Sequence, residues 1–281
     1  MKKLIWLLLA APFVLGSCKK DSDSNPSPSP AASACVTTEE RDSASNSLTE
    51  SYEYDANRRI IKQFNYSDGV KSGYSSFSYS GNTITIRSYN MNNSPDGNPS
   101  VATLNSSGYI SGVVGFGPDT IDNIPGISRD TTLLSYNSSG QMLSYSSRNW
   151  FRDESNNVIS QYNLTQTFEY TSGRVSKQTN DFTSNGFSSN SVQVYTYDEN
   201  SPVVTSNPIV SLFSIAGSEL FGKLQSNRIP VKIESTNGSG GQPVITTIAA
   251  TVDAKGNPTK IRTVSGNAGS AYTLLYGYNC P

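Results

Sequence analysis

The stretch that decides the fold is residues 52–69, which read YEYDANRRIIKQFNYSDG. A tyrosine-bearing segment enters a short polar turn at Asp55, and an alternating apolar segment leaves that turn at Ile60. Asp, Asn, Ser and Gly tolerate the positive φ angles of tight turns, and β-branched and aromatic residues favour the strands on either side. The stretch therefore predicts a β-hairpin.

Variants of this hairpin recur at 77–86, 104–110, 133–143, 168–177, 194–204 and 250–261. Ile84 and Ile86 share one face of the segment 83–88, and Val192 and Val194 share one face of the segment 192–197, with more polar residues opposite. Such alternation is typical of an antiparallel sheet with one buried face. Short turns keep strands that are neighbours in sequence neighbours in space. We therefore expect a mainly β domain at 35–281, an up-and-down antiparallel meander that is curved or closed.

One segment departs from this period. Apolar residues recur at helical spacing behind Pro208, namely Ile209, Leu212, Phe213, Ala216 and Leu220. The spacing predicts a single amphipathic helix at 209–221. This helix is expected to cover an apolar sheet face or barrel mouth; the alternative is a plug that gates the barrel or contacts a ligand.

The N-terminus has the layout of a secretory signal. Lys2 and Lys3 precede an apolar run that ends at Leu15, too short for a spanning helix. The last residues before and including Cys18 (LGSC) resemble the lipobox of bacterial lipoproteins. The resemblance implies that residues 1–17 are cleaved and that Cys18 is acylated, which anchors the chain stably through several acyl chains. An ordinary signal peptide with a chance cysteine is the alternative.

The resemblance extends to the place of the anchor. Lys19 is not the aspartate that resembles an inner-membrane retention signal, which favours the outer membrane. The Lys and Asp residues after Cys18 resemble the tethers of surface-exposed lipoproteins, which favours the cell surface over the periplasmic face. Residues 18–34 are rich in Ser and Pro and predict an extended spacer between lipid and domain.

Two further cysteines, Cys35 and Cys280, stand at the two ends of the predicted domain. In an oxidising compartment the economical interpretation is a disulfide between them. The alternative is two free thiols, one of them a nucleophile. The chain contains no histidine, so no imidazole is present to activate such a thiol.

Composition narrows the possible functions further. Without histidine the chain lacks the commonest general base and the commonest zinc ligand. The net charge of −1 gives no electrostatic footprint for nucleic acid. The second strand face is polar rather than lipid-like, so a soluble barrel is expected rather than a membrane-spanning one. We expect no catalytic residues, no cofactor and no metal site.

Three adjacent acidic pairs are the remaining candidates for chemistry: Glu39-Glu40, Asp153-Glu154 and Asp198-Glu199. Neighbours on a strand point to opposite faces, and in turns such residues cap backbone amides, so we do not expect these pairs to act as acid and base. A calcium site at Asp119, Asp122 and Asn123 is weighed against an irregular loop, which the flanking Pro118 and Pro125 favour.

The turns resemble YD-type repeats of large secreted shell-forming proteins, with Tyr54-Asp55 and Tyr197-Asp198 keeping the dipeptide. The whole layout resembles an uncharacterised, Bacteroidetes-type group of Gram-negative lipoproteins with a porin-like β fold; that resemblance implies a fold and no activity. The sixteen tyrosines and ten phenylalanines suit binding of glycan or protein. We therefore expect a non-enzymatic envelope module whose ligand-binding residues stay unknown. The alternative is a lipid-anchored glycoside hydrolase or lyase that uses carboxylates or tyrosine.

Overall fold

The computed structural model describes residues 36–200, 228–238, 240–266 and 270–279. Within these residues no helix is long and apolar enough to cross a membrane. The strands are β1 (Val36–Asp42), β2 (Leu48–Tyr54), β3 (Ile60–Ser67), β4 (Val70–Ser80), β5 (Thr83–Asn90), β6 (Ser100–Leu104), β7 (Ile110–Ile121), β8 (Ile124–Tyr136), β9 (Met142–Asp153), β10 (Val158–Thr171), β11 (Arg174–Ser184), β12 (Phe187–Thr196), β13 (Lys232–Asn237), β14 (Val244–Val252), β15 (Pro258–Ser265) and β16 (Ser270–Asn279).

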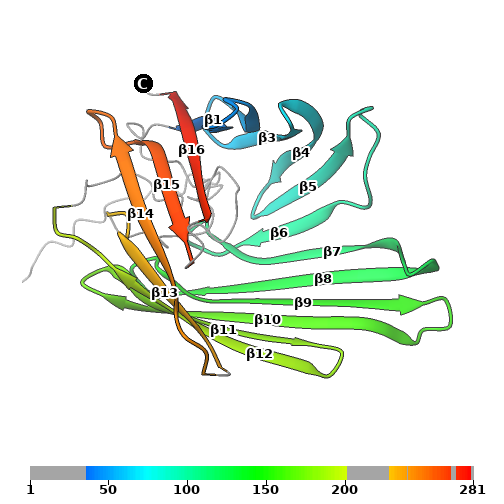
Figure 1. Ribbon diagram of the computed structural model, residues 1–281. Coiled ribbons are helices and arrows are strands. Elements are labelled where there is room, and N and C mark those ends of the chain that lie inside the picture. Colours follow the sequence, from blue (N-terminus) through cyan, green and yellow to red (C-terminus); the bar gives the residue numbers. More distant parts are fainter. Residues whose placement is uncertain (1–35, 201–227, 239, 267–269, 280–281) are drawn as a thin grey trace, which may run out of the picture.

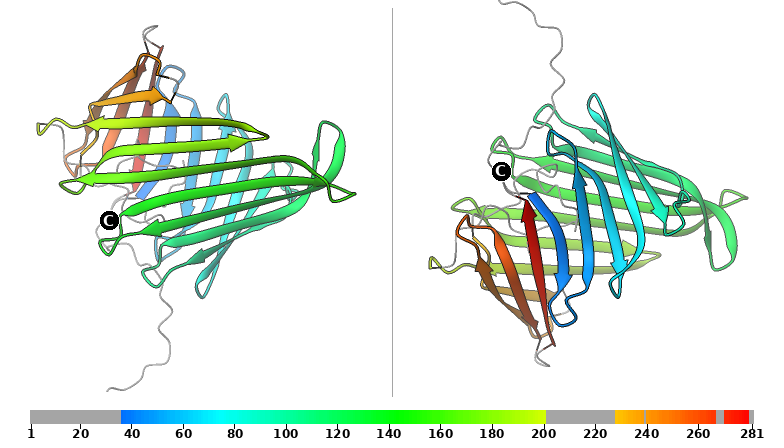
Figure 2. Two further views of the ribbon diagram at one scale, coloured as in Figure 1. Left: turned by 90° about the horizontal axis from the view of Figure 1, so that it is seen from below. Right: turned by 90° about the horizontal axis from the view of Figure 1, so that it is seen from above.

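These sixteen strands form one closed barrel in which every strand pairs with its neighbours in sequence (Figures 1 and 2). All the pairs are antiparallel, and β1 closes the barrel on β16 with a register from Val36 opposite Asn279 to Asp42 opposite Leu274. The predicted up-and-down meander is therefore confirmed, and it is closed rather than merely curved. Closure pairs the edge strands that an open sheet would expose to aggregation.

The two ends of the barrel differ. The near end is the one where β1 begins and β16 ends, and it holds the β2–β3, β4–β5, β6–β7, β8–β9, β10–β11 and β14–β15 turns. The far end holds the other hairpins. The long strands β7 to β10 project past their neighbours at the far end (Figure 1).

A single hydrogen-bond pattern closes most of the longer turns. In the turn after Tyr54, the Asp55 amide donates to the Arg59 carbonyl at 2.9 Å, and Asp55 Oδ1 accepts from the Asn57 and Arg59 amides at 2.9 Å. The same pattern recurs at the near end on Asn105, Asn137 and Asp253, and at the far end on Asn90. Asx side chains therefore supply the turn structure that the repeat predicted.

The apolar core lines the inner wall at the near end. Its main cluster consists of Ile60, Phe77, Ile84, Ala102, Leu104, Ile110, Leu134, Met142, Phe168, Val175 and Tyr195. Each of these residues lies close to the end of its strand that meets a near-end turn. The apolar and tyrosine residues of the repeat therefore pack together. A second cluster of Ile229, Ile248 and Ile261 continues the wall across β13 to β16.

Towards the barrel's middle the inner wall becomes polar. Tyr195 donates to Gln178 Oε1 at 2.7 Å, and the amides of Gln166 and Gln178 both donate to Asn180 Oδ1, at 2.8 and 2.7 Å. Asn180 in turn donates to Ser191 Oγ at 3.1 Å. This network contributes to the low apolar fraction of the chain, because amides rather than hydrocarbon form this part of the inward face.

Some expectations need correction or stay open. The expected apolar face of 192–197 is wrong, because Tyr195 points into the core and Val194 is 42% exposed on the outside. The irregular loop expected around Pro118 and Pro125 is also wrong, because β7 and β8 run as a regular hairpin to the turn at Asp122 and Asn123. The predicted helix at 209–221 and Cys18, Cys35 and Cys280 lie outside the described residues.

Hairpin geometry explains the two prolines. The pair Ile121–Ile124 next to the two-residue turn exchanges hydrogen bonds, so pairs alternate from there along the ladder. Thr120–Pro125 and Pro118–Ile127 therefore fall at positions that exchange none. A proline there removes no ladder bond, since the missing N–H would point away from the partner strand.

Candidate functional site

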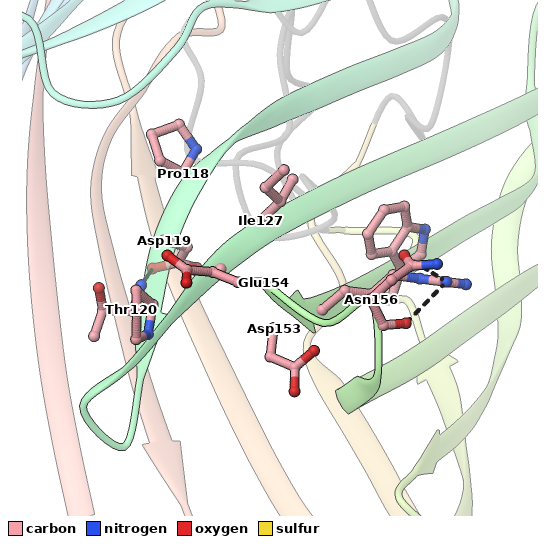
Figure 3. A pocket seen from close by; sticks show the side chains of 11 residues that line it. Pro118, Asp119, Thr120, Ile127, Asp153, Glu154 and Asn156 are labelled. Atoms are coloured by element: carbon pink, nitrogen blue, oxygen red, sulfur yellow. Dashed lines mark hydrogen bonds between the residues drawn. The ribbon is translucent and has the colours of Figure 1, made fainter.

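A groove of about 620 Å³ lies among the described residues at the far end of the barrel. It lies between the β7–β8 hairpin and the turn after β9 (Figure 3). Its walls include Pro118, Ile127, Trp150, Arg152 and Asn156. A concavity with aromatic walls and a few polar groups is the usual form of a binding site for a small ligand.

Strand register places these side chains together. Ile127 lies opposite Pro118 on one side and opposite Arg152 on the other, so the three side chains form a row across β7, β8 and β9. Trp150 precedes Arg152 by two residues and shares its face. Phe151 between them is fully buried on the inner side, which places Trp150 and Arg152 outside.

Gly126 allows the strands under the groove to come close. A Cβ atom at this position would lie 2.1 Å from the Arg152 carbonyl oxygen and 2.7 Å from Phe151 Cζ. Neither distance is compatible with a side chain, so only glycine fits between the backbone of β9 and the Phe151 ring. The buried Phe151 ring thus supports the strand that carries Trp150.

The charged groups of the groove are held in defined positions. The Arg152 guanidinium lies 5.1 Å from the centre of the Trp150 ring, and its Nη1 donates to the Asn156 carbonyl at 3.3 Å and to Asn156 Oδ1 at 3.0 Å. Asp153 accepts from the side chain and the amide of Asn157, which together lower the pKa of its carboxyl. The Trp150–Arg152 pair is therefore fixed in place before any ligand binds.

The rim of the groove is acidic. Asp119, Asp153 and Glu154 line it against a single guanidinium, that of Arg152. Asp119 Oδ1 accepts from the Thr120 amide at 2.7 Å, and Glu154 is exposed with no hydrogen-bond partner among the described residues. An indole face beside free carboxylate and amide oxygens can stack on a sugar ring and accept hydrogen bonds from its hydroxyls.

A second group of candidate residues faces the interior. Glu40 and Glu50 are directly opposite in the β1–β2 ladder. Glu50 accepts a short hydrogen bond from the Tyr52 hydroxyl and another from Gln63 Nε2 at 3.2 Å. Burial raises the pKa of the Glu40 carboxyl, against the opposing effect of a hydrogen bond from Thr49. The pair thus combines two carboxylates in a desolvated wall.

Two of the three acidic pairs of the sequence divide their side chains between different partners, whereas Asp153 and Glu154 both line the groove. Glu39 points outward to Arg41 at 3.0 Å, whereas Glu40 points inward. In the pair at 198–199, Asp198 Oδ1 accepts from the Asn200 amide, and Glu199 pairs with Arg174 at 2.7 Å. Sequence reasoning did not identify the opposition of Glu40 and Glu50, because it depends on strand register.

The calcium alternative gains no support. Asp122 and Asn123 form the tight turn of the β7–β8 hairpin, with φ angles of 51° and 64°, and Asp119 belongs to the groove. Among the described residues no three acidic, histidine or cysteine side chains gather as a metal site. No sequence pattern marks Trp150 and Arg152 as candidate site residues, because the groove that they line is formed by the register of β7, β8 and β9.

Comparison with known proteins bears on the fold. No protein-family model and no curated protein matches the sequence. A porin-like protein from Bacteroides vulgatus is 18% identical with a TM-score of 0.60, over 88% of this chain and 99% of that one. A porin-like protein from Bacteroides uniformis is 15% identical with a TM-score of 0.55, over 90% and 100%. The chain is therefore similar in fold, a closed antiparallel barrel, to porin-like proteins of Bacteroides.

Proposed function

We propose that this protein is a lipid-anchored envelope protein that binds carbohydrate in the groove at the far end of its barrel. The observation that carries the proposal is the Trp150 ring, fixed by Arg152 on the wall of a groove of about 620 Å³. Flat apolar sugar faces stack on such rings, and the surrounding carboxylates and amide bind hydroxyl groups.

The position of the groove supports this role. The described chain begins at Val36 at the near end, and the groove lies at the opposite end. A tether of residues 18–34 acylated at Cys18 would therefore hold the barrel by its near end and present the groove away from the lipid. The likeness to porin-like proteins of Bacteroides suggests an envelope location.

Charges on the outer face support a barrel that stands outside the bilayer. Arg129 and Arg148 are exposed on the outer face of β8 and β9, and an exposed Glu169–Lys177 pair with a 2.7 Å contact crosses β10 and β11. Arginine or lysine on the lipid face of a spanning barrel costs roughly 2–4 kcal/mol at the bilayer midplane. A lipid anchor on a barrel in water avoids that cost.

Tryptophan fluorescence provides a direct test. The sequence has two tryptophans, Trp6 and Trp150, so removal of residues 1–17 leaves Trp150 as the only indole. A glycan array with the unacylated mature chain should identify uncharged ligands, and each of them should shift the Trp150 emission on titration. Trp150→Ala should weaken binding at least about tenfold, which is about 1.4 kcal/mol.

The matched control is Phe187→Ala, which removes an exposed ring outside the groove. It should leave the affinity unchanged. An uncharged array hit that binds Trp150→Ala as tightly as the natural protein would contradict the proposal, and so would an uncharged hit that leaves the Trp150 emission unchanged.

The interior carboxylates favour a second candidate, a glycoside hydrolase or lyase. The raised pKa of Glu40 opposite Glu50 is the combination that a general acid and its partner need. Release of reducing ends from a bound glycan would support this activity if Glu50→Gln abolished it while Trp150 fluorescence still reported binding. Binding without any product release would leave the non-enzymatic proposal in place.

A further inference from the structure

Three aromatic rings form a ladder on the outer face of β3, β4 and β5. Phe64 lies opposite Tyr74, and Tyr74 lies opposite Tyr89. The Phe64 and Tyr74 ring centres are 5.6 Å apart, and those of Tyr74 and Tyr89 are 4.6 Å apart with planes 8° from parallel. Gln63 and Gly73, the strand neighbours of Phe64 and Tyr74, are buried on the inside, so the ladder faces out.

Two lysines gather around these rings. Lys71 Nζ lies 4.3 Å from the centre of the Phe64 ring and 4.7 Å from that of Tyr74. Lys62 Nζ lies 5.8 and 5.9 Å from the same two centres. Lys62 also contacts Glu53 at 3.5 Å, whereas no carboxylate of the described chain lies within ion-pair distance of Lys71. The rings thus concentrate positive charge around them.

Arg87 adds a third cation to the same face, because it precedes Tyr89 by two residues on β5. Of Lys62, Lys71 and Arg87, only Lys62 forms an ion pair among the described residues, with Glu53, although the whole chain has a net charge of −1. Cross-strand stacking explains why the rings are paired. It does not explain three like charges on one face, whose mutual repulsion an anion would relieve.

We propose that this ladder binds an acidic polysaccharide, a chain that carries carboxylate or sulfate groups on its sugar rings. The apolar faces of the sugars would pack against the half-buried rings, and the anionic groups would pair with Lys62, Lys71 and Arg87. The site is independent of the groove, whose rim has the opposite charge sign. The two surfaces therefore select ligands of different charge.

Binding of the mature chain to polygalacturonate and to chondroitin sulfate tests the inference, with neutral dextran and single-stranded DNA as comparison polymers. We expect binding to both acidic polysaccharides that weakens at least about tenfold between about 50 and 500 mM salt, because screening shortens the range of the attraction. Lys62→Gln with Lys71→Gln should weaken binding by about tenfold or more, whereas Lys62→Arg with Lys71→Arg should retain it.

The controls separate this surface from the rest of the barrel. Lys177→Gln, on the outer face of β11, should leave polysaccharide binding unchanged. Glu53→Gln removes the carboxylate that pairs with Lys62 and should tighten binding about twofold or more. A gain in affinity cannot result from a destabilised fold. Equal binding of the double glutamine variant, equal affinity for the DNA or dextran, or no gain with Glu53→Gln would overturn the proposal.

Discussion

Tyrosine hydroxyls complete the hydrogen-bonding of the barrel at the near end. Tyr136 donates to the Ile110 carbonyl at 2.6 Å, and Tyr170 donates to the Met142 carbonyl at 2.7 Å. In both cases the backbone ladder to the preceding strand ends before it reaches the tyrosine. The β7–β8 ladder ends at Leu133, and the β9–β10 ladder ends at Thr167. The hydroxyl therefore supplies a donor to a carbonyl that lies beyond the last backbone pair. Tyr54 and Tyr79 bond to carbonyls of the preceding strand in the same way.

Removal of one hydroxyl should reveal this role. Tyr136→Phe keeps the ring in the core but leaves the Ile110 carbonyl without its donor, so we expect a loss of roughly 1–3 kcal/mol in the free energy of unfolding. Tyr89→Phe is the control, because the Tyr89 ring lies on the outer face and its hydroxyl makes no hydrogen bond among the described residues. Urea unfolding measures both. Equal midpoints for the two variants would refute a capping role.

Glycine substitutions in two near-end turns separate backbone strain from steric overlap. Gly140 and Gly173 have nearly equal φ angles, +78° and +77°. A Cβ on Gly140 would lie 2.8 Å from the Tyr109 hydroxyl oxygen, whereas a Cβ on Gly173 meets nothing within 4 Å. Gly173→Ala should cost about 1–2 kcal/mol from the left-handed backbone alone. Gly140→Ala should cost roughly 1 kcal/mol more. Equal losses in thermal unfolding would show that Tyr109 moves aside freely.

Residue identity predicted turns better than it predicted which face of a strand is buried. Asp, Asn and Gly mark the turns because few residues accept a positive φ, although Arg58 does so at 63°. Which side chains of residues 192–197 point into the barrel could not be predicted, because valine and tyrosine are both compatible with a core. Tyr195 is inside since its hydroxyl reaches Gln178, and that partner lies on another strand.

At the scale of the element, the Asx turn is a unit that tolerates either Asp or Asn at its first position. Asp253 accepts from the Asn257 side chain at 2.9 Å and from its amide at 2.9 Å. In the sibling turn, Asn137 forms the same bonds with the amides and donates its own amide to Gln141 Oε1 at 2.8 Å. The geometry is shared, and only the aspartate version carries a charge.

This difference predicts how acid stability depends on the turns. Hydrogen bonds from Asn157 and Asn257, first from the side chain and then from the amide, lower the pKa of Asp153 and Asp253. A carboxyl whose pKa is lower in the folded state stabilises the fold above its unfolded pKa of about 4, and that stability is lost as pH falls through the folded pKa.

The test is Asp153→Asn combined with Asp253→Asn. Near neutral pH the variant should unfold at about the same urea concentration as the natural protein. As the pH falls below about 4, the natural protein should lose more stability than the variant, since only the natural protein has carboxyls at positions 153 and 253 that take up protons. Parallel pH profiles for the two proteins would contradict the argument.

The hairpins could be predicted from the sequence, and the groove could not. Each turn is local and depends on residues within five positions, such as Asp55 and Arg59. The groove requires the register of three strands, the close approach at Gly126 and the unequal lengths of β7 to β10. None of these is local, because each depends on the strands on both sides.

At the scale of the whole molecule, closure depends on one seam between strands at opposite ends of the chain. β1 and β16 pair along their length, with one irregularity between Thr37 and Glu39. Every other pair joins strands that are consecutive in chain order, so the seam is the pairing with the longest sequence separation in the described topology. Long-range pairing carries the largest loop-closure entropy, which makes this seam the natural place for a covalent bond.

The last prediction is a disulfide between Cys35 and Cys280. The described register ends with Val36 opposite Asn279, one residue short of each cysteine. If this register continued by one residue, Cys35 and Cys280 would lie directly opposite each other. Opposed residues in antiparallel strands have Cβ atoms about 4.5–5.5 Å apart. The mean Cβ–Cβ distance in disulfides is slightly shorter, about 3.8 Å. Small shifts of the backbone at the strand ends would bring the two Cβ atoms to that distance.

Mass spectrometry of a non-reduced digest of the mature, unacylated chain should show the linked peptides. Cys35→Ser with Cys280→Ser should lower the free energy of unfolding by up to about 5 kcal/mol, because the bond closes a very long loop in the unfolded chain. A reducing agent should destabilise the natural protein and leave the double variant unchanged. Two alkylated free thiols in the folded natural protein would refute the bond, and the seam would then be held by β1–β16 pairing alone.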